Sequence, residues 1–308
     1  MKLETSIDLI GNSPLLSLSR IYRGEGRIFA KAEFLNPGGS IKDRAALSII
    51  RSARRRRVLV NGQPVVEMTS GNMGAGLAIV CAAFEHPFTA VMSAGNSPAR
   101  ASMMRGLGAE VVLTAQVDGT PGRVTGKDIA AATAAAVTLA AESGAFYVDQ
   151  FNSVDCVAAH ETTTGPELWA QLDGQIDAFV ACVGSAGSFV GIARFLKAKN
   201  PAIRCVCVEP KGAEILAGRA VTKASHLLQG TGYGLVPPLW QSELMDGAIS
   251  ISDEEAEQWR WLIGSQEGLY VGYSAAANVC AAVQLLKSGV LSAASHVVTL
   301  LCDTGLKY

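Results

Sequence analysis

One segment, Asn36–Arg44, constrains this chain more than any other; it has the sequence N-P-G-G-S-I-K-D-R. Pro37 and the two glycines after it break the preceding extended segment and stiffen a turn. Ser40 then stands where its side chain can cap a helix, so Lys42 falls in that helix's first turn. The helix dipole disfavours a protonated amine there, and such an amine can form a Schiff base with a carbonyl compound. A solvated lysine at a helix start is the alternative, and it is the common case for single lysines.

Short β-rich runs alternate with helical stretches along most of the 308 residues. The strand-like runs are almost uniformly apolar, which is typical of strands buried on both faces of a parallel sheet. Their alternation with helices favours α/β layers joined by right-handed crossovers. The Ala-rich run 128–143 predicts the clearest helix, and Ser252 with Glu255 predicts a capping box that opens another. The expected strands are 27–30, 65–68, 88–92, 110–113, 147–148, 178–183, 205–208 and 297–302.

The chain is longer than a typical single domain, yet no low-complexity linker divides it. Residues 149–153 are the best candidate for a crossing between two α/β lobes. Ligands of open parallel sheets bind at the carboxyl ends of strands, so the loops after the expected strands could converge on one cleft.

Composition narrows the class of protein. Hydrophobic residues make up 49% of the chain and charged residues 17%, which is enough for a large buried core. A net charge of −1 gives no electrostatic case for binding nucleic acid or an anionic membrane. The one basic run, Arg51 with Arg54–Arg57, ends an expected helix, where a solvated cationic terminus suits the dipole. No signal peptide opens the sequence and no apolar run could span a bilayer, so we expect a cytoplasmic protein.

The cysteines and histidines give no metal-binding pattern. Seven cysteines are scattered without a C-x-x-C pair, most of them in apolar stretches, as free thiols in a reducing cytosol are. Cys205 and Cys207 share one face of an expected strand, but no histidine completes a set of ligands, and the four histidines are isolated. We therefore expect no metal site.

The loop over residues 69–74, T-S-G-N-M-G, follows one expected strand and precedes an apolar helix over 75–83. Backbone amides at a helix start, two hydroxyls and one amide side chain make a nest suited to a carboxylate. An ordinary capped helix is the alternative.

A second loop, residues 184–188 with the sequence G-S-A-G-S, also lies between an expected strand and a helix. Its small residues let backbone N–H groups approach a phosphate closely, and the helix dipole favours the negative charge. Gly184, Gly187 and Gly191, with the acidic Glu209 after the next strand, also fit a dinucleotide fingerprint. A nicotinamide cofactor therefore stays open on these residues alone.

Taken in order, these motifs resemble the cysteine synthase (O-acetylserine sulfhydrylase) and cystathionine β-synthase family of fold type II pyridoxal-phosphate enzymes. The resemblance runs from I-G-N-S-P-L at 10–15 to D-T-G at 303–305, nearly the whole chain. It implies two parallel-sheet, three-layer α/β lobes similar to tryptophan synthase β, and a homodimer. The family's lysine motif, substrate loop and phosphate loop match residues 36–44, 69–74 and 184–188. Residues 150–152 and 160–167 look like the segment typical of the cysteine synthase branch.

The resemblance also implies how pyridoxal 5'-phosphate is held. Lys42 would carry it as an internal aldimine and then serve as general base at the substrate Cα. Asn72 would hydrogen-bond its 3′ oxygen. Ser274 would face the pyridine nitrogen with a hydroxyl, which cannot hold that nitrogen protonated and so favours prompt loss of a β-leaving group; a helix N-cap is a compatible role. The phosphate would lie on Gly184, Ser185, Ala186, Gly187 and Ser188.

For the substrate, the resemblance implies a carboxylate site and a glycine-rich loop that lines the cleft. The loop is represented by Gly230, and the carboxylate ligands are Thr69, Ser70, Met73 (through its backbone) and Gln150. The resemblance further implies a small lobe over residues 37–148 that carries the substrate loop, and a large lobe made of 1–36 plus 149–308 that carries the phosphate loop.

Departures from the family pattern gather on the substrate side. Met73 replaces a usual threonine, Tyr233 replaces a smaller residue, A-A-A at 275–277 replaces S-G-A, and Leu306 replaces a common acid. We predict β-replacement on an activated L-serine, O-acetyl-L-serine or similar, through an aminoacrylate, with sulfide giving cysteine. One alternative is a specialised relative with another leaving group or nucleophile, making a non-proteinogenic amino acid or cystathionine, or running β-elimination. Another is a catalytically weak binding or regulatory paralogue.

Overall fold

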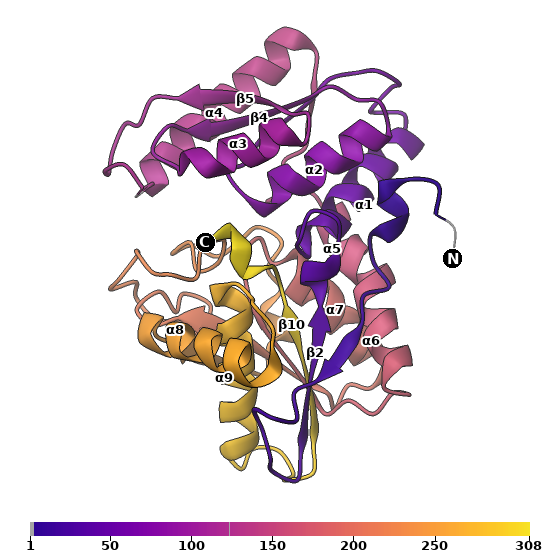
Figure 1. Cartoon of the computed structure of the whole chain (residues 1–308), viewed down its shortest axis with the longest axis vertical. Helices are drawn as coiled ribbons and strands as arrows, with labels where there is room; N and C mark the ends of the chain where they lie inside the picture. The colour runs from indigo at the N-terminus through magenta and orange to yellow at the C-terminus, as the bar shows by residue number, and fades with distance from the viewer. Residues whose placement is uncertain (1–2, 123) are drawn as a thin grey trace. The chain divides into compact units, whose positions relative to one another are not determined.

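The computed structural model describes residues 3–122 and 124–308. The chain divides into two compact units, unit 1 formed by Met1–Ile10 and Asn36–Cys156, and unit 2 formed by Gly11–Leu35 and Val157–Tyr308. Each unit has a β-sheet of its own with helices packed on it (Figure 1). The division into two lobes with separate roles, 37–148 and 1–36 plus 149–308, stays a prediction.

Unit 1 contains a four-stranded parallel sheet in the order β5-β4-β3-β6. Its core on one face joins Val66 and Val91 of the sheet to Ala136 and Ala140 of the Ala-rich helix α4. The strands are β3 (Val65–Met68), β4 (Phe88–Ser93), β5 (Glu110–Thr114) and β6 (Phe146–Tyr147), and the helices are η1 (Ser6–Leu9), α1 (Lys42–Arg55), α2 (Asn72–Ala83), α3 (Pro98–Gly106) and α4 (Gly126–Ser143).

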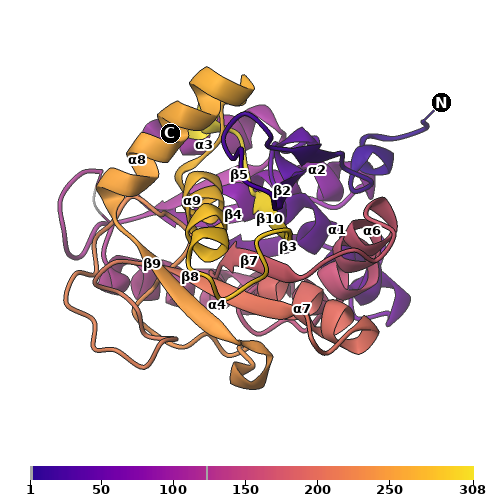
Figure 2. The ribbon, with the colours of Figure 1, turned by 90° about the horizontal axis from the view of Figure 1, so that it is seen from below.

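Unit 2 contains a six-stranded sheet in the order β1-β2-β10-β7-β8-β9, in which only the β1–β2 pair is antiparallel. Helices α8 and α9 cover one face of this sheet, and α6 and α7 cover the other (Figure 2). The strands are β1 (Leu15–Ser17), β2 (Arg27–Ala32), β7 (Ala178–Cys182), β8 (Arg204–Pro210), β9 (Gly247–Ile251) and β10 (His296–Leu301). The α-helices are α6 (Gly165–Gln171), α7 (Gly187–Lys199), α8 (Asp253–Leu262) and α9 (Tyr273–Lys287). The short helices are η2 (Glu33–Leu35), η3 (His160–Thr164), η4 (Ser242–Leu244), η5 (Ile263–Glu267) and η6 (Gly305–Lys307). Helix α5 (Asp155–Ala159) begins in unit 1 and ends in unit 2.

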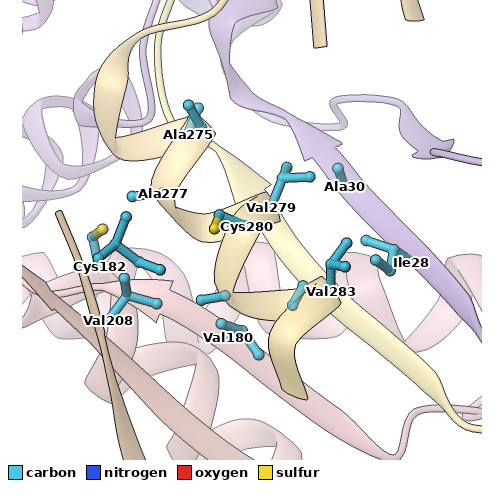
Figure 3. Close-up of a cluster of buried hydrophobic side chains, with 14 of the residues drawn as sticks. Ile28, Ala30, Val180, Cys182, Val208, Ala275, Ala277, Val279, Cys280 and Val283 are labelled. Atoms are coloured by element: carbon cyan, nitrogen blue, oxygen red, sulfur yellow. The ribbon is translucent and has the colours of Figure 1, made fainter. Parts of the chain in front are cut away.

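Helix α9 forms the centre of the unit 2 core. Its small and β-branched side chains, including Ala277 and Val279, lie against apolar side chains of the sheet such as Ala30, Val180 and Val208 (Figure 3). Alanine lets a helix approach a sheet closely and favours the helix itself, so the run A-A-A at 275–277 suits this position. The predicted fold class, parallel-sheet α/β in two parts, is confirmed.

The sequence-based interpretation of the basic run as a solvated helix terminus is confirmed. Helix α1 ends at Arg55 as expected, and four of the five arginines are exposed. Arg56 forms an ion pair with Asp155 at 2.7 Å, and Arg54 donates to the ring nitrogen Nε2 of His86 at 2.7 Å. Over the two described stretches, no helix combines the length and the apolar character needed to cross a membrane.

Candidate active site

The turn before α1 is held by side chains of α1 itself and of the turn. The N–H of Gly38 donates to a carboxylate oxygen of Asp43 at 2.5 Å, and the N–H of Lys42 donates to Oγ of Ser40 at 3.3 Å. Ile41 directly precedes α1 and already has helical backbone angles, so the Ser40 side chain caps the helix start as predicted, by accepting the first helical N–H. Lys42 is therefore the first residue of α1 and is half-buried.

Helix α1 packs closely on helix α2 at a glycine. A Cβ atom on Gly76 would lie 3.1 Å from Cα of Asp43 and 3.2 Å from Cβ of Ala46. Because Asp43 and Gly76 lie near the starts of their helices, this contact places the two N-termini side by side. Lys42 and Asn72, each the first residue of its helix, are thus brought into the same region of unit 1.

The loop between β3 and α2 is held in place by its first residue, Thr69. Oγ1 of Thr69 accepts the N–H of Gly74 at 3.0 Å. Thr69 is buried and Ser70 is half-buried, while the side chain of Met73 is only 3% exposed. The Met73 side chain is therefore buried beneath the loop, and Met73 can bind an anion only through its backbone N–H.

Gln150 follows β6 and is anchored by a carboxyl group that sequence reasoning missed. Glu67, on β3, is 1% exposed and accepts the N–H of Asp149 at 2.9 Å and that of Gln150 at 3.3 Å. Sγ of Cys156 donates to the Gln150 carbonyl at 3.3 Å. Burial raises the pKa of Glu67 to about 8, although the hydrogen bonds from the neighbouring amides act against that rise. The available signal was one acid within the apolar strand V-V-E-M.

In unit 2, the loop 184–188 connects β7 to α7. Its backbone lies very close to the backbone of residues 230–232. A Cβ atom on Gly184 would collide with the carbonyl oxygen of Gly230, and the N–H of Gly232 donates to the Val183 carbonyl at 3.3 Å. Ala186 has φ +70°, the left-handed region that lets the chain turn into α7. The first N–H groups of α7 have no partner within the helix, so this turn is suited to a phosphate.

Ser274 lies in the first turn of α9 and is 6% exposed. The N-cap of α9 is Gly272, so the alternative role of Ser274 as an N-cap is wrong. Asn278, one turn further on, accepts the N–H of Cys182 at 2.7 Å and donates to the Leu300 carbonyl at 2.9 Å. This buried amide ties α9 to the ends of β7 and β10. Sequence reasoning missed Asn278; the signal was one amide side chain within the run A-A-A-N-V-C.

The position of Glu209 argues against the alternative of a nicotinamide cofactor. Glu209 is 2% exposed, and its carboxyl oxygens accept the N–H groups of Leu216 at 2.8 Å and Ala217 at 2.9 Å. Because these backbone N–H groups already occupy both oxygens of Glu209, its carboxylate is not available to bind the ribose of a dinucleotide. In residues 3–122 and 124–308, no set of three His, Cys, Asp or Glu side chains is placed to hold a metal ion, and all seven cysteines are free thiols.

Comparison with known proteins identifies the family. Residues 7–303 match the family described as pyridoxal-phosphate dependent enzyme. The chain belongs to this family. A cysteine synthase of Staphylococcus aureus is 35% identical to it over 302 residues, which cover 97% of this chain and 93% of the relative. This pyridoxal-phosphate dependent enzyme is thus of the cysteine synthase type, and the resemblance read from its motifs is confirmed.

Solved structures agree with this assignment. An O-acetylserine dependent cystathionine β-synthase from Helicobacter pylori has a TM-score of 0.90 at 32% identity, covering 100% of this chain and 97% of that one. A hydrogen sulfide-producing enzyme from Fusobacterium nucleatum has a TM-score of 0.92 at 31% identity, covering 100% and 98%. Members with closely similar folds therefore carry the names of different reactions.

Proposed function

We propose that this pyridoxal-phosphate dependent enzyme catalyses β-replacement on O-acetyl-L-serine or a similarly activated L-serine, with sulfide as nucleophile and cysteine as product. The observation that carries this proposal is the placement of Lys42 at the start of α1, beside the start of α2 and the loop 69–74. An amine next to a carboxylate-binding loop is what removal of a proton from an amino acid's Cα requires. The cysteine synthase at 35% identity supports the choice of reaction.

The residues present fit pyridoxal 5'-phosphate. The close approach of Gly184 to Gly230 and the start of α7 make a backbone phosphate site from Gly184, Ser185, Ala186, Gly187 and Ser188. Lys42 supplies the amine that would hold the cofactor, Asn72 an amide for its 3′ oxygen, and Ser274 a hydroxyl for its ring nitrogen. When bound, the cofactor supplies an electron sink for the charge that develops at Cα.

The chain's own residues then bind and orient the substrate. Thr69, Ser70, the backbone N–H of Met73 and Gln150 would bind the substrate carboxylate, which fixes the Cα–H bond toward the Lys42 amine. Lys42 would take that proton and later return it. Gly230 would contribute backbone to the substrate side, because a glycine with φ +84° presents its peptide groups without a side chain.

The second candidate function is a relative with another leaving group or nucleophile. Met73 and Tyr233, which is 40% exposed, favour it, because they change the size of groups beside the predicted substrate residues. A panel of nucleophiles (sulfide, cyanide, homocysteine, ammonia) separates the two. Equal or faster turnover with sulfide than with every other member supports cysteine synthesis.

The deciding experiment uses purified protein loaded with pyridoxal phosphate. We expect a visible absorption band that changes when O-acetyl-L-serine is added without a nucleophile, and that recovers on adding sulfide. Lys42→Ala removes turnover, whereas the matched control Lys287→Ala, at the far end of α9, retains it. A protein that binds the cofactor but does not respond to O-acetyl-L-serine contradicts the donor, and one that never binds it contradicts the cofactor. Activity that survives in Lys42→Ala contradicts the role of Lys42.

We further propose a homodimer in the cytoplasm. The seven free thiols support a reducing compartment, since such cysteines oxidise or pair in secreted proteins. The dimer rests on the family resemblance, and sedimentation equilibrium tests it directly.

A further inference from the structure

The carboxyl group of Glu67 lies between the two segments that we propose as substrate-carboxylate ligands. Glu67 is on β3, and that strand runs directly into Thr69 and Ser70 at its carboxyl end. From the same position its two oxygens reach the backbone N–H groups of Asp149 and Gln150, at 2.9 Å and 3.3 Å. One side chain therefore connects the segments, which are about eighty residues apart in the sequence.

The turn that presents Gln150 has a conformation that needs such support. Asp149 has φ +51°, which is uncommon for residues other than glycine, although aspartate adopts it more readily than most. Asn152 fixes the outer side of the turn by donating its side-chain amide to the Asp149 carboxylate at 2.9 and 3.0 Å. The two N–H groups on the inner side point to Glu67, which is 1% exposed, so water cannot replace its oxygens there.

Glu67 also constrains the residue that is proposed to bind substrate. The backbone N–H of Gln150 donates to Glu67 at 3.3 Å, and the Gln150 carbonyl accepts from Sγ of Cys156 at 3.3 Å. Both peptide groups that flank the Gln150 Cα are therefore held. The backbone from which the Gln150 side chain extends is thus fixed, while its side-chain amide stays available to a bound carboxylate.

We propose that Glu67 is a positioning residue for the substrate: through the backbone N–H groups of Asp149 and Gln150 it fixes Gln150 relative to the loop that starts at Thr69, and so determines the affinity for the amino-acid carboxylate. This inference rests on the proposed function. Glu67 itself touches no reacting atom in this scheme. Its effect belongs to binding of the amino acid and leaves the proton transfer by Lys42 unaffected.

The test compares Glu67→Ala, Glu67→Gln, Gln150→Ala and the double variant Glu67→Ala/Gln150→Ala. The affinity for O-acetyl-L-serine is read from the visible absorption change without nucleophile, and kcat is measured with sulfide. We expect Glu67→Ala to raise Kd by roughly 10-fold and Glu67→Gln by roughly 3-fold, because the glutamine oxygen still accepts one of the two N–H groups. We expect kcat to change by less than about 2-fold, since the chemical step is untouched. Glu110→Ala, an exposed glutamate at the start of β5 in the same sheet, is the control and leaves both values unchanged.

The double variant distinguishes a positioning role of Glu67 from a general loss of structure. If Glu67 acts through Gln150, the double variant binds no more weakly than Gln150→Ala alone. Independent, multiplying effects of the two substitutions would overturn the proposal. Where Glu67→Ala does not fold, the cycle of Glu67→Gln with Gln150→Ala answers the same question.

A second measurement does not depend on the donor. Hydrogen exchange of the amides of Asp149 and Gln150, in protein without cofactor, rises at least about 10-fold in Glu67→Ala and stays near wild type in Glu110→Ala. Unchanged exchange overturns the proposal. A wild-type protein that does not respond to O-acetyl-L-serine contradicts the proposed donor instead, and the exchange result then decides the role of Glu67 by itself.

Discussion

Burial of the Glu67 carboxyl couples the stability of unit 1 to pH. Burial raises its pKa from 4.5 to about 8, so between those pH values the folded protein keeps a proton that the unfolded chain has released. The folded state binds more protons in this range, and its stability must therefore fall as the pH rises. The contribution is complete below about pH 4.5 and is lost as the pH approaches 8.

Glu67→Gln should remove this dependence. Between about pH 5 and pH 8, we expect the wild-type free energy of unfolding to fall by a few kcal/mol relative to that of Glu67→Gln. Urea unfolding followed by far-UV circular dichroism at several pH values measures it. The control is Glu110→Gln, which is exposed on the same sheet and should run parallel to wild type. Parallel curves for wild type and Glu67→Gln would contradict the raised pKa.

Gly184 is the residue at which the proposed phosphate site is most easily destroyed. A methyl group there would collide with the Gly230 carbonyl, so Gly184→Ala must separate the two backbone segments. We expect at least about 10-fold weaker binding of pyridoxal phosphate, measured by titrating the visible absorption. Gly106→Ala, at the end of α3 with open space around its Cβ, is the matched control and should bind normally. Normal binding by Gly184→Ala would place the phosphate elsewhere.

Among single residues, sequence reasoning identified those with an unusual local context and missed those defined by a distant partner. Lys42 directly follows a loop of unusual composition, and Gly184 begins another. Glu67 and Asn278 are polar residues within apolar runs, and their partners lie 83 and 96 positions away. Apolar periodicity predicts which positions are buried, but it does not say which buried backbone groups need a hydrogen-bond partner.

At the scale of elements, the strands of unit 1 and the central strands of unit 2 were predictable, whereas the two edge strands of the unit 2 sheet were not. The expected strand over 65–68 coincides with β3, and the capping box of Ser252 with Glu255 is present at the start of α8. Strands β1 and β9 were not predicted, and they form the two edges of the six-stranded sheet. Both strands are partly exposed, and neither has the continuous apolar run that marks a central parallel strand.

The contact between α1 and α2 gives a prediction about a pair of elements. Gly76→Ala places a methyl group about 3.1 Å from Cα of Asp43, closer than ordinary packing allows. We expect a loss of about 1–3 kcal/mol in the free energy of unfolding, because the helices must move apart. Gly126→Ala, in the first turn of α4 with no atom near its Cβ, should be neutral or stabilising. Urea unfolding by circular dichroism compares them, and equal stability of the two variants would show that α1 shifts without cost.

At the scale of the whole molecule, unit 2 is assembled from two separate segments of the chain. Strand β2, from the segment 11–35, pairs with β10 near the C-terminus. All four tryptophans lie between residues 157 and 308, so tryptophan fluorescence follows the unfolding of unit 2. Sequence reasoning placed residues 1–36 and 149–308 together only through the family resemblance, since no local pattern encodes a pairing across 250 residues or more.

The ion pair of Lys31 with Glu167 joins those two segments. Lys31 is fully buried and lies 2.8 Å from the Glu167 carboxylate, with further bonds to the Ser13 carbonyl at 2.9 Å and the Gln171 side chain at 3.0 Å. Its removal would leave a largely buried carboxylate without its cation, and such a loss typically costs about 3–5 kcal/mol.

We expect Lys31→Ala to lose roughly that amount in urea unfolding followed by tryptophan fluorescence. Lys223→Ala breaks a pair of equally short distance, 2.6 Å to Asp253, but its side chain is 52% exposed. Water and salt screen that pair, so its loss should cost no more than about 1 kcal/mol. Similar costs for the two variants would mean that the interior at Lys31 admits water. In that case, the strand pairing of β2 with β10 would hold the two segments together without help from the ion pair.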